Sequence, residues 1–212
     1  WYFSKKWYSL WYKDKNKGVD KVITLLYFEE YESNLSHELL KRKDINPIII
    51  RTNKNMKFFN ESYLESTKNV LNYVIDYYND IDNEVLKFKN WLKDNDIKID
   101  HFLNDSEYYL EFSNRFARKL GLYALSDEQI RWVRDKVDMK KRFREIGLDT
   151  VDFKEINSKD ELKKFFVDNG SKRIIFKPRR GMNSIETYMI NSLEDIDVLE
   201  IDIIPGKYMA ED

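Results

Sequence analysis

Residues 173–184 read RIIFKPRRGMNS, and no other stretch of the chain is as informative. Three apolar residues, Ile174 to Phe176, predict a buried strand, and Pro178 predicts its end because proline cannot donate to a strand ladder. One lysine and two arginines lie at this point, and Gly181 lets backbone N–H groups approach a ligand closely. A cationic turn of this kind is typical of an anion site, although the same residues also suit a solvated loop.

The spacing of this turn differs from the two common phosphate-binding loops. No lysine followed by serine or threonine stands at the P-loop distance from a glycine, and the GxGxxG pattern is absent. Residues 184–191 alternate apolar and polar side chains and predict a hairpin partner for the strand. The expected order is therefore strand, turn, strand, with the turn covering an anion as a flap.

Composition narrows the function classes. Among 212 residues, 37 are Lys or Arg and 38 are Asp or Glu, and this balance argues against a dedicated nucleic-acid binder. The chain has no cysteine, which excludes disulfides and zinc thiolate sites, and its two histidines offer little for a catalytic triad. No apolar run approaches the roughly 18 residues of a membrane span, so a cytoplasmic location without membrane contact is expected.

The first half alternates short apolar runs with amphipathic segments. This alternation predicts doubly wound α/β structure with a parallel sheet over residues 19–122. The expected strands are 21–28, 45–52 and 99–104, and the expected helices are 33–43, 61–80, 83–95 and 106–122.

The pattern changes near residues 123–127, where we place a domain boundary. Beyond it the expected helices are 126–148, 158–170 and 192–199, and the expected strands are 150–156, 173–178, 184–191 and 206–212. Residues 1–18 form a separate aromatic segment, in which Phe3, Trp7 and Trp11 are spaced by four as on a helix face. This segment is expected to pack on the body of the protein, with a partner or membrane-surface contact as the alternative.

Four motifs occur in the order of the ATP-grasp superfamily and resemble its carbamoyl-phosphate synthetase, biotin carboxylase and glycinamide ribonucleotide synthetase branch. They are ARKLGL (117–122), RDKVDMKKRFREIGLDTVDF (134–153), IIFKPRRGMNS (174–184) and YMAED (208–212). The resemblance implies a Rossmann-like, parallel-sheet pre-ATP-grasp domain (19–125) and then the small α+β lobe of an ATP-grasp domain (126–212). It also implies that the chain is truncated at the hinge strand.

The resemblance assigns nucleotide-binding roles by position, while catalytic residues stay unknown. Lys136 and Lys177 match the lysines that touch nucleotide phosphates, and Glu211 matches the hinge acid near adenine, with Ala210 and Asp212 offering backbone contacts. The matching flap residues are Arg179, Arg180, Gly181, Asn183 and Ser184. Glu186 stands where the family often has glycine, which puts a negative charge near the phosphates unless it points away. No metal ligand is predicted in this chain, and the Mg²⁺ ligands are expected in the lobe that follows in the family.

The function implied is the ATP-binding part of an ATP-dependent carboxylate–amine or carboxylate–thiol ligase that acts through an acyl phosphate. ATP and a carboxylate substrate are the expected partners, a homodimer is compatible with the sequence, and this chain alone is expected to be inactive. The alternative is a non-catalytic nucleotide- or partner-binding module in a larger assembly. Nucleic-acid binding through the basic helix Arg131–Arg144 and through Arg179–Arg180 is disfavoured by the net charge of -1.

Overall fold

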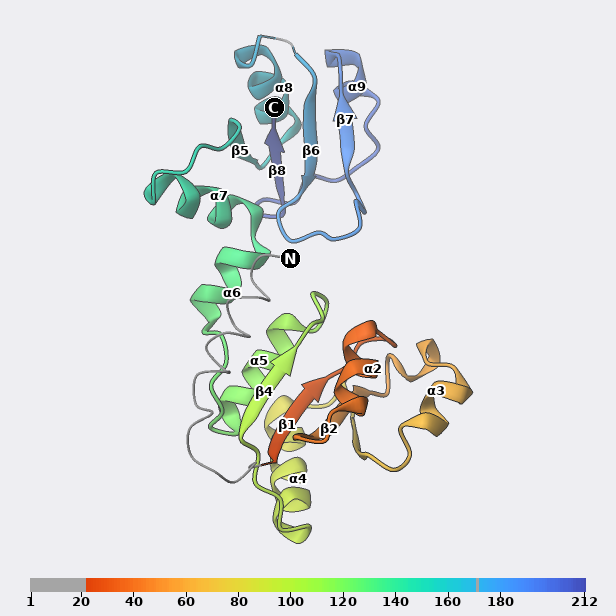
Figure 1. Ribbon diagram of the computed structural model, residues 1–212. Helices are drawn as coiled ribbons and strands as arrows, with labels where there is room; N and C mark the ends of the chain where they lie inside the picture. The colour runs from red at the N-terminus through yellow and green to blue at the C-terminus, as the bar shows by residue number, and fades with distance from the viewer. Residues whose placement is uncertain (1–21, 171) are drawn as a thin grey trace. The chain divides into compact units, whose positions relative to one another are not determined.

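The structure, a computed structural model, describes residues 22–170 and 172–212. It divides into two compact units, Trp1–Ala124 and Leu125–Asp212 (Figure 1). The aromatic segment 1–18, for which a helix was predicted, lies outside the described residues.

The first unit is built on a four-stranded parallel sheet with the strand order β3-β2-β1-β4. Its strands are β1 (Ile23–Phe28), β2 (Ile45–Thr52), β3 (Leu71–Ile75) and β4 (His101–Asn104). Its helices are α2 (Asn34–Lys41), the 3₁₀ turn η2 (Met56–Phe58), α3 (Glu61–Ser66), α4 (Ile81–Asp94) and α5 (Leu110–Lys119). The central strand β1 pairs on both sides, since Leu26 lies opposite Ile48 of β2 and Phe102 of β4.

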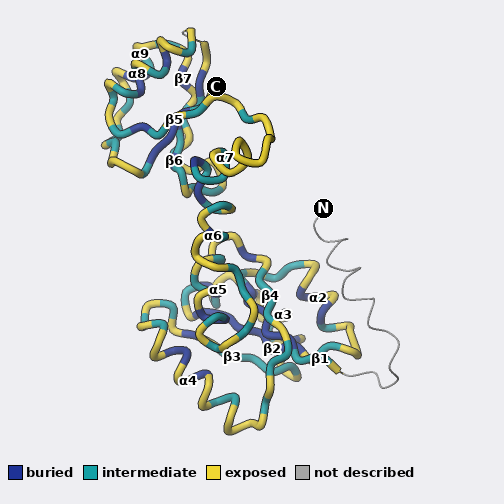
Figure 2. Tube along the Cα trace, turned by 90° about the vertical axis from the view of Figure 1, so that its left-hand side faces the viewer, coloured by how far each residue is buried: buried dark blue, intermediate teal, exposed yellow. Residues whose placement is uncertain are grey.

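Helices cover both faces of this sheet. Alternate residues of β1 point to opposite faces, so each face contributes side chains to a core. Leu26 and Phe28 pack in the larger core with Phe88 of α4 and Phe116 of α5. Leu25 and Tyr27 face the other way, against Leu39 of α2. Figure 2 shows the buried strands enclosed by exposed helix surfaces. The predicted doubly wound α/β architecture is confirmed.

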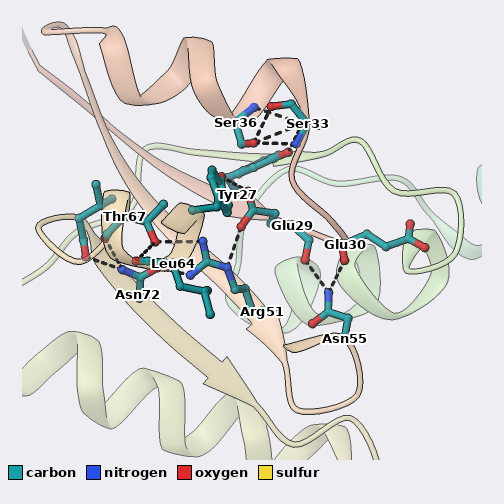
Figure 3. A network of polar contacts seen from close by, with 12 residues as sticks. Tyr27, Glu29, Glu30, Ser33, Ser36, Arg51, Asn55, Leu64, Thr67 and Asn72 are labelled. Atoms are coloured by element: carbon teal, nitrogen blue, oxygen red, sulfur yellow. Dashed lines mark hydrogen bonds and ion pairs between the residues drawn. The ribbon is translucent and has the colours of Figure 1, made fainter. Parts of the chain in front are cut away.

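A buried ion pair ties β1 to β2 (Figure 3). The Arg51 Nε donates to Glu29 Oε2 over 2.7 Å, and the two side chains are 5% and 0% exposed. The other guanidinium nitrogens donate to Asn72 Oδ1 at 2.8 Å and Thr67 Oγ1 at 3.3 Å. Glu29 Oε1 accepts a further bond from the Tyr63 hydroxyl. Every member of this network therefore has a partner, as buried charges require.

The single helix predicted over 61–80 is wrong. The helix α3 ends at Ser66, and residues 71–75 form β3, paired in parallel with β2. Thr67 and Asn72 end the helix, because the Thr67 hydroxyl donates to Leu64 O and the Asn72 amide donates to Thr67 O and Val70 O. These side-chain bonds offer the backbone an alternative to helix, and β2 then supplies a ladder for the strand.

The second unit contains an antiparallel sheet with the order β5-β8-β6-β7. Its elements are α6 (Asp127–Arg134), α7 (Lys136–Glu145), β5 (Phe153–Ile156), α8 (Lys159–Asp168), β6 (Ile174–Pro178), β7 (Tyr188–Ile190), α9 (Leu193–Asp197) and β8 (Tyr208–Glu211). Phe176, Ala210 and Ile190 point from one sheet face into the core with α8 and α9. The hairpin of β6 and β7 is confirmed, but β7 is shorter than the predicted 184–191.

The single helix predicted over 126–148 is also wrong, because it is broken at Asp135. This residue has extended backbone angles (φ -93°, ψ 111°), ends α6 and begins α7. Its carboxylate accepts bonds from the backbone N–H groups of Val137 at 3.0 Å and Asp138 at 3.3 Å. Asp135 is therefore the N-cap of a second helix, and its side chain satisfies N–H groups that an unbroken helix would pair internally.

Candidate functional site

The sheet face opposite the core of the second unit carries a cluster of charged side chains, which we call the lysine–glutamate triad: Lys140, Lys177 and Glu211. Lys177 and Glu211 point away from the core because their strand neighbours Phe176 and Ala210 point into it. The Lys177 ammonium donates to Glu211 Oε1, and Lys140 Nζ of α7 lies 3.2 Å from Glu211 Oε2. Two cations thus share one carboxylate, which leaves the triad with an excess positive charge.

The triad keeps its carboxylate ionised. Burial alone would raise the pKa of Glu211, but the bonds from Lys177 and Lys140 outweigh it and hold that pKa below its ordinary value. All three side chains are less than one-fifth exposed. An anion that reached this face would therefore meet partly dehydrated ammonium groups, which attract it more strongly than exposed lysines do.

Lys136 lies at the base of the flap, which comprises residues 179–184. Its backbone N–H donates to Arg179 O at 2.9 Å, and its ammonium donates to Gly181 O at 2.7 Å. The residue stands at the start of α7 because Asp135 caps that helix. The first turn of α7 and the flap are thus joined through one lysine.

Arg179 forms ion pairs on three sides. Its guanidinium lies 3.0 Å from the Asp135 carboxylate, 3.5 Å from Asp138 and 2.7 Å from Glu155 of β5. Burial would raise the pKa of Asp135, but Arg179 and the N–H groups at the start of α7 hold it below its ordinary value. Arg179 therefore braces α7 against the sheet, while half-exposed Arg180 contacts the same Asp135 at 3.4 Å.

The flap and the residues after it contain left-handed backbone at three positions that are not glycine. Asn183 has φ 52°, Ser184 φ 57° and Glu186 φ 54°. Such angles cost L-residues roughly 1–2 kcal/mol each, with asparagine the best tolerated. Gly181 has an ordinary φ, but a Cβ there would lie 3.2 Å from the Pro178 Cβ, so bulk at this turn is disfavoured.

The Glu186 carboxylate is paired with residues at the start of β8 and does not face the flap as a free charge. Its Oε2 accepts from the Tyr208 hydroxyl at 2.7 Å and lies 2.9 Å from Lys207 Nζ. These two partners hold the pKa of Glu186 below its ordinary value. The negative charge that the sequence placed near the flap is therefore neutralised at the start of β8.

The end of β8 offers little backbone for a ligand. Ala210 is fully buried and has strand partners on both sides, Lys154 and Phe176, so it does not present the free backbone groups expected of it. The N–H of Asp212 donates to Asp152 O at 3.1 Å, and its side chain is exposed.

The structure brings the predicted residues into two groups. Lys136, Arg179 and Gly181 meet at the flap base, whereas Lys177 and Glu211 meet in the triad. Reasoning from sequence missed Lys140, Asp135 and Lys207, although Lys140 follows Lys136 by four residues and so shares its helix face.

Comparison with known proteins shows which solved structures share this fold. The sequence matches no protein-family model and no curated protein, but the structure matches solved structures with high probability. One is the L-amino acid ligase from Bacillus licheniformis (14% identity, TM-score 0.62), which aligns with 90% of this chain and 44% of its own. A second is the biotin carboxylase domain of the 2-oxoglutarate carboxylase from Hydrogenobacter thermophilus (13%, 0.62), with 89% and 43% covered. A third is N5-carboxyaminoimidazole synthetase from Staphylococcus aureus complexed with ADP (14%, 0.59), with 92% and 48% covered.

The chain has the fold of part of these ATP-grasp enzymes. The predicted resemblance is thereby confirmed for the fold, and the chain spans less than half the length of these structures. The parallel sheet of the first unit and the antiparallel sheet of the second both belong to this ATP-grasp fold.

Mg²⁺ accompanies ADP in the biotin carboxylase structure, so we asked whether this chain could hold it. Among residues 22–170 and 172–212, no group of three or more His, Asp or Glu side chains gathers as metal ligands would. The two carboxylates nearest the lysines, Asp135 and Glu211, are already ion-paired. The described residues thus present no ready-made cluster of metal ligands. In the same part of the chain, no helix has the length and apolar character needed to cross a bilayer.

Proposed function

We propose that the second unit binds ATP and is the nucleotide-holding part of an ATP-dependent ligase. The observation that carries this proposal is the lysine–glutamate triad on the sheet face opposite the core, together with Lys136 at the flap base. Solved structures of this fold were obtained with ADP, ATP or MgADP, which supports a nucleotide as the anion. A triphosphate requires several cations, and three partly buried lysines meet that need.

The proposed site uses each group for a distinct part of the nucleotide. Lys136 and Lys177 contact the phosphates, and Lys140 keeps Glu211 charge-paired when Lys177 turns toward the ligand. The N–H groups of the flap, including Asn183 and Ser184, cover the phosphates from one side. Glu211 meets the adenine edge, while Arg179 and Arg180 hold the flap base through Asp135.

Calorimetric titration with ATP tests the binding step. Lys136→Gln removes one charge but retains an amide that can donate to Gly181 O, so the flap base should persist. We expect this variant and Lys177→Ala each to weaken ATP binding about tenfold or more, as for the loss of a charge-assisted bond. The matched control is Lys164→Ala, an exposed lysine of α8. Equal affinities in all four proteins, with unchanged circular dichroism, would refute the site.

The ligase step is proposed to proceed through an acyl phosphate. A substrate carboxylate oxygen attacks the γ-phosphorus of ATP and ADP leaves; an amine or thiol then attacks the acyl carbon and phosphate leaves. An ¹⁸O atom of the carboxylate must therefore appear in the released phosphate. Incubating the full-length gene product with ATP, an ¹⁸O-labelled acid and a nucleophile tests this, with L-amino acids and bicarbonate as first candidates. ATP binding without labelled phosphate would instead favour a non-catalytic nucleotide-binding module.

A further inference from the structure

The carboxyl ends of the parallel strands in the first unit carry an unusual group of side chains. Lys54 follows β2, Tyr77 and Tyr78 follow β3, and Tyr108 and Tyr109 follow β4. Ligands of open α/β sheets bind outside the carboxyl ends of the strands. The position of this group on the sheet is therefore one at which binding is expected.

The crevice between β1 and β4, where the strand order reverses, is filled by the protein itself. The Tyr27 hydroxyl donates to Asp105 Oδ2 at 2.8 Å, and the Ser106 hydroxyl donates to Glu30. The Asn55 amide donates to the carbonyl oxygens of Glu29 and Glu30, which directly follow β1, both at 2.8 Å (Figure 3). Because these polar groups bind one another, they are less available to a ligand than the Lys54 ammonium.

Lys54 lies among tyrosine rings. Its Nζ is 4.6 Å from the Tyr108 ring centroid, 4.7 Å from Tyr77 and 6.0 Å from Tyr78, which are cation–π distances. It donates to the Tyr108 hydroxyl and has no carboxylate partner among the residues that the structure describes. An ammonium group has three N–H donors, so two remain for a ligand.

One side of the cluster packs on the protein core, and the other side is exposed to solvent. Tyr77 packs edge-on against buried Tyr109, with ring centroids 5.4 Å apart, and the Tyr109 hydroxyl pairs with Thr52 Oγ1 at 2.9 Å. Tyr78 and Tyr108 are 74% and 39% exposed. Exposed aromatic rings on a fixed base are characteristic of recognition surfaces.

Asp76, which precedes Tyr77 in the sequence, does not neutralise Lys54. Asp76 accepts bonds from the Asn53 amide at 2.7 Å and from the Tyr78 N–H at 3.1 Å. The cluster therefore presents one cation beside apolar ring faces, which matches a ligand with one anionic group on a flat ring.

We propose that Lys54, Tyr77, Tyr78 and Tyr108 form a binding site for a small organic acid that carries a planar ring. The carboxylate accepts from the Lys54 ammonium, and the ring packs on the outer tyrosines. This site belongs to the first unit and does not depend on nucleotide binding, so either proposal can fail alone.

Nuclear magnetic resonance of the chain labelled with [ε-¹³C]lysine tests the site. Ring currents from Tyr77 and Tyr108 should move the Lys54 ε-methylene signal away from those of other lysines, and Lys54→Gln assigns it. Benzoate is the probe, with benzamide as its neutral isostere and benzyltrimethylammonium as its cationic analogue. We expect benzoate to shift the Lys54 signal to saturation, with benzamide binding about tenfold more weakly because it lacks the charge.

Variants separate this site from general affinity for benzoate, with the signals of the unchanged tyrosines as a second readout. Lys54→Gln and Tyr78→Leu should each weaken benzoate binding several-fold or more. Lys57→Gln is the matched control, because Lys57 lies three residues later with its Nζ 5.2 Å from the Phe58 ring, and it should bind benzoate normally. Equal binding of benzoate and benzamide, preference for the cationic probe, or equal losses at Lys54 and Lys57 would overturn the proposal.

Discussion

Replacement of Arg51 by methionine should destabilise the first unit strongly. The side chain is 5% exposed, and its three nitrogens bond Glu29, Asn72 and Thr67. Methionine fills much of the same volume, so the main loss is electrostatic. Among the described residues, the buried Glu29 carboxylate would keep only the Tyr63 hydroxyl as a side-chain partner. Removing one partner of a buried ion pair costs about 3–5 kcal/mol, a large part of the total stability of one unit.

A double-mutant cycle measures the coupling. Glu29→Met and Arg51→Met should each cost several kcal/mol, whereas the double variant should cost less than their sum by about 2 kcal/mol or more, because no unpaired charge remains. Arg42→Met is the matched control, since its ion pair with Asp44 is exposed and should contribute less than about 1 kcal/mol.

Urea unfolding followed by hydrogen exchange provides the assay. Amides of Ile48 to Ile50 in β2 report on the first unit, and those of β6 report on the second. With a urea slope of about 2 kcal/mol per molar, the Arg51→Met midpoint should fall by about 2 M for the first unit only. Additive losses in the cycle, or an effect no larger than that of Arg42→Met, would show that the pair contributes little and that our account of the network is wrong.

Changes at three further positions test the second unit. Since the pKa of Asp135 is lowered in the folded state, its contribution to stability is present above the ordinary carboxyl range near pH 4 and is lost as pH falls through the folded value. Asp135→Asn can still cap α7, so its urea midpoint should fall less steeply between pH 5 and 2, and an unchanged slope would contradict this. Asn183→Gly should stabilise by up to about 1 kcal/mol and Asn183→Val should destabilise by about 1–2 kcal/mol in thermal melts, because φ is 52°. Glu186→Gln should make limited proteolysis within residues 179–187 about two- to fivefold faster, with cleavage elsewhere unchanged as the control.

The strands that the sequence predicts well are those whose apolar runs stand between turn residues. The strands β1, β2 and β6 lie within their predicted ranges or match them. Each contains a run of apolar residues that packs into a core on at least one face of its sheet. β3 was missed because apolar residues at intervals of three and four continue from α3 into it. Its richness in valine, tyrosine and isoleucine could have indicated a strand, but the decisive factor is the ladder with β2, which is tertiary.

Part of the candidate site was also accessible from sequence. Lys136 and Lys177 were singled out by motif. In the structure both are partly buried, Lys136 at the flap and Lys177 on the sheet. The ion pairs of Arg179 could not be predicted, since its acidic partners come from α7 and β5, which only the fold brings together. Lys140 was not singled out, because sequence periodicity does not reveal which side of a helix a sheet will cover.

The strand order of each sheet has a consequence for protein synthesis. β1 is synthesised before the other described strands of its sheet, yet one of its edges stays unpaired until β4, beginning at His101, has been made. At translation speeds of about 5–20 residues per second, this apolar edge is exposed for on the order of ten seconds, long enough for chaperones to bind it. The second unit depends still more on its last strand, because β8 lies between β5 and β6. A ribosome that stalls before Tyr208 would therefore hold a first unit able to fold and a second unit whose sheet lacks its middle.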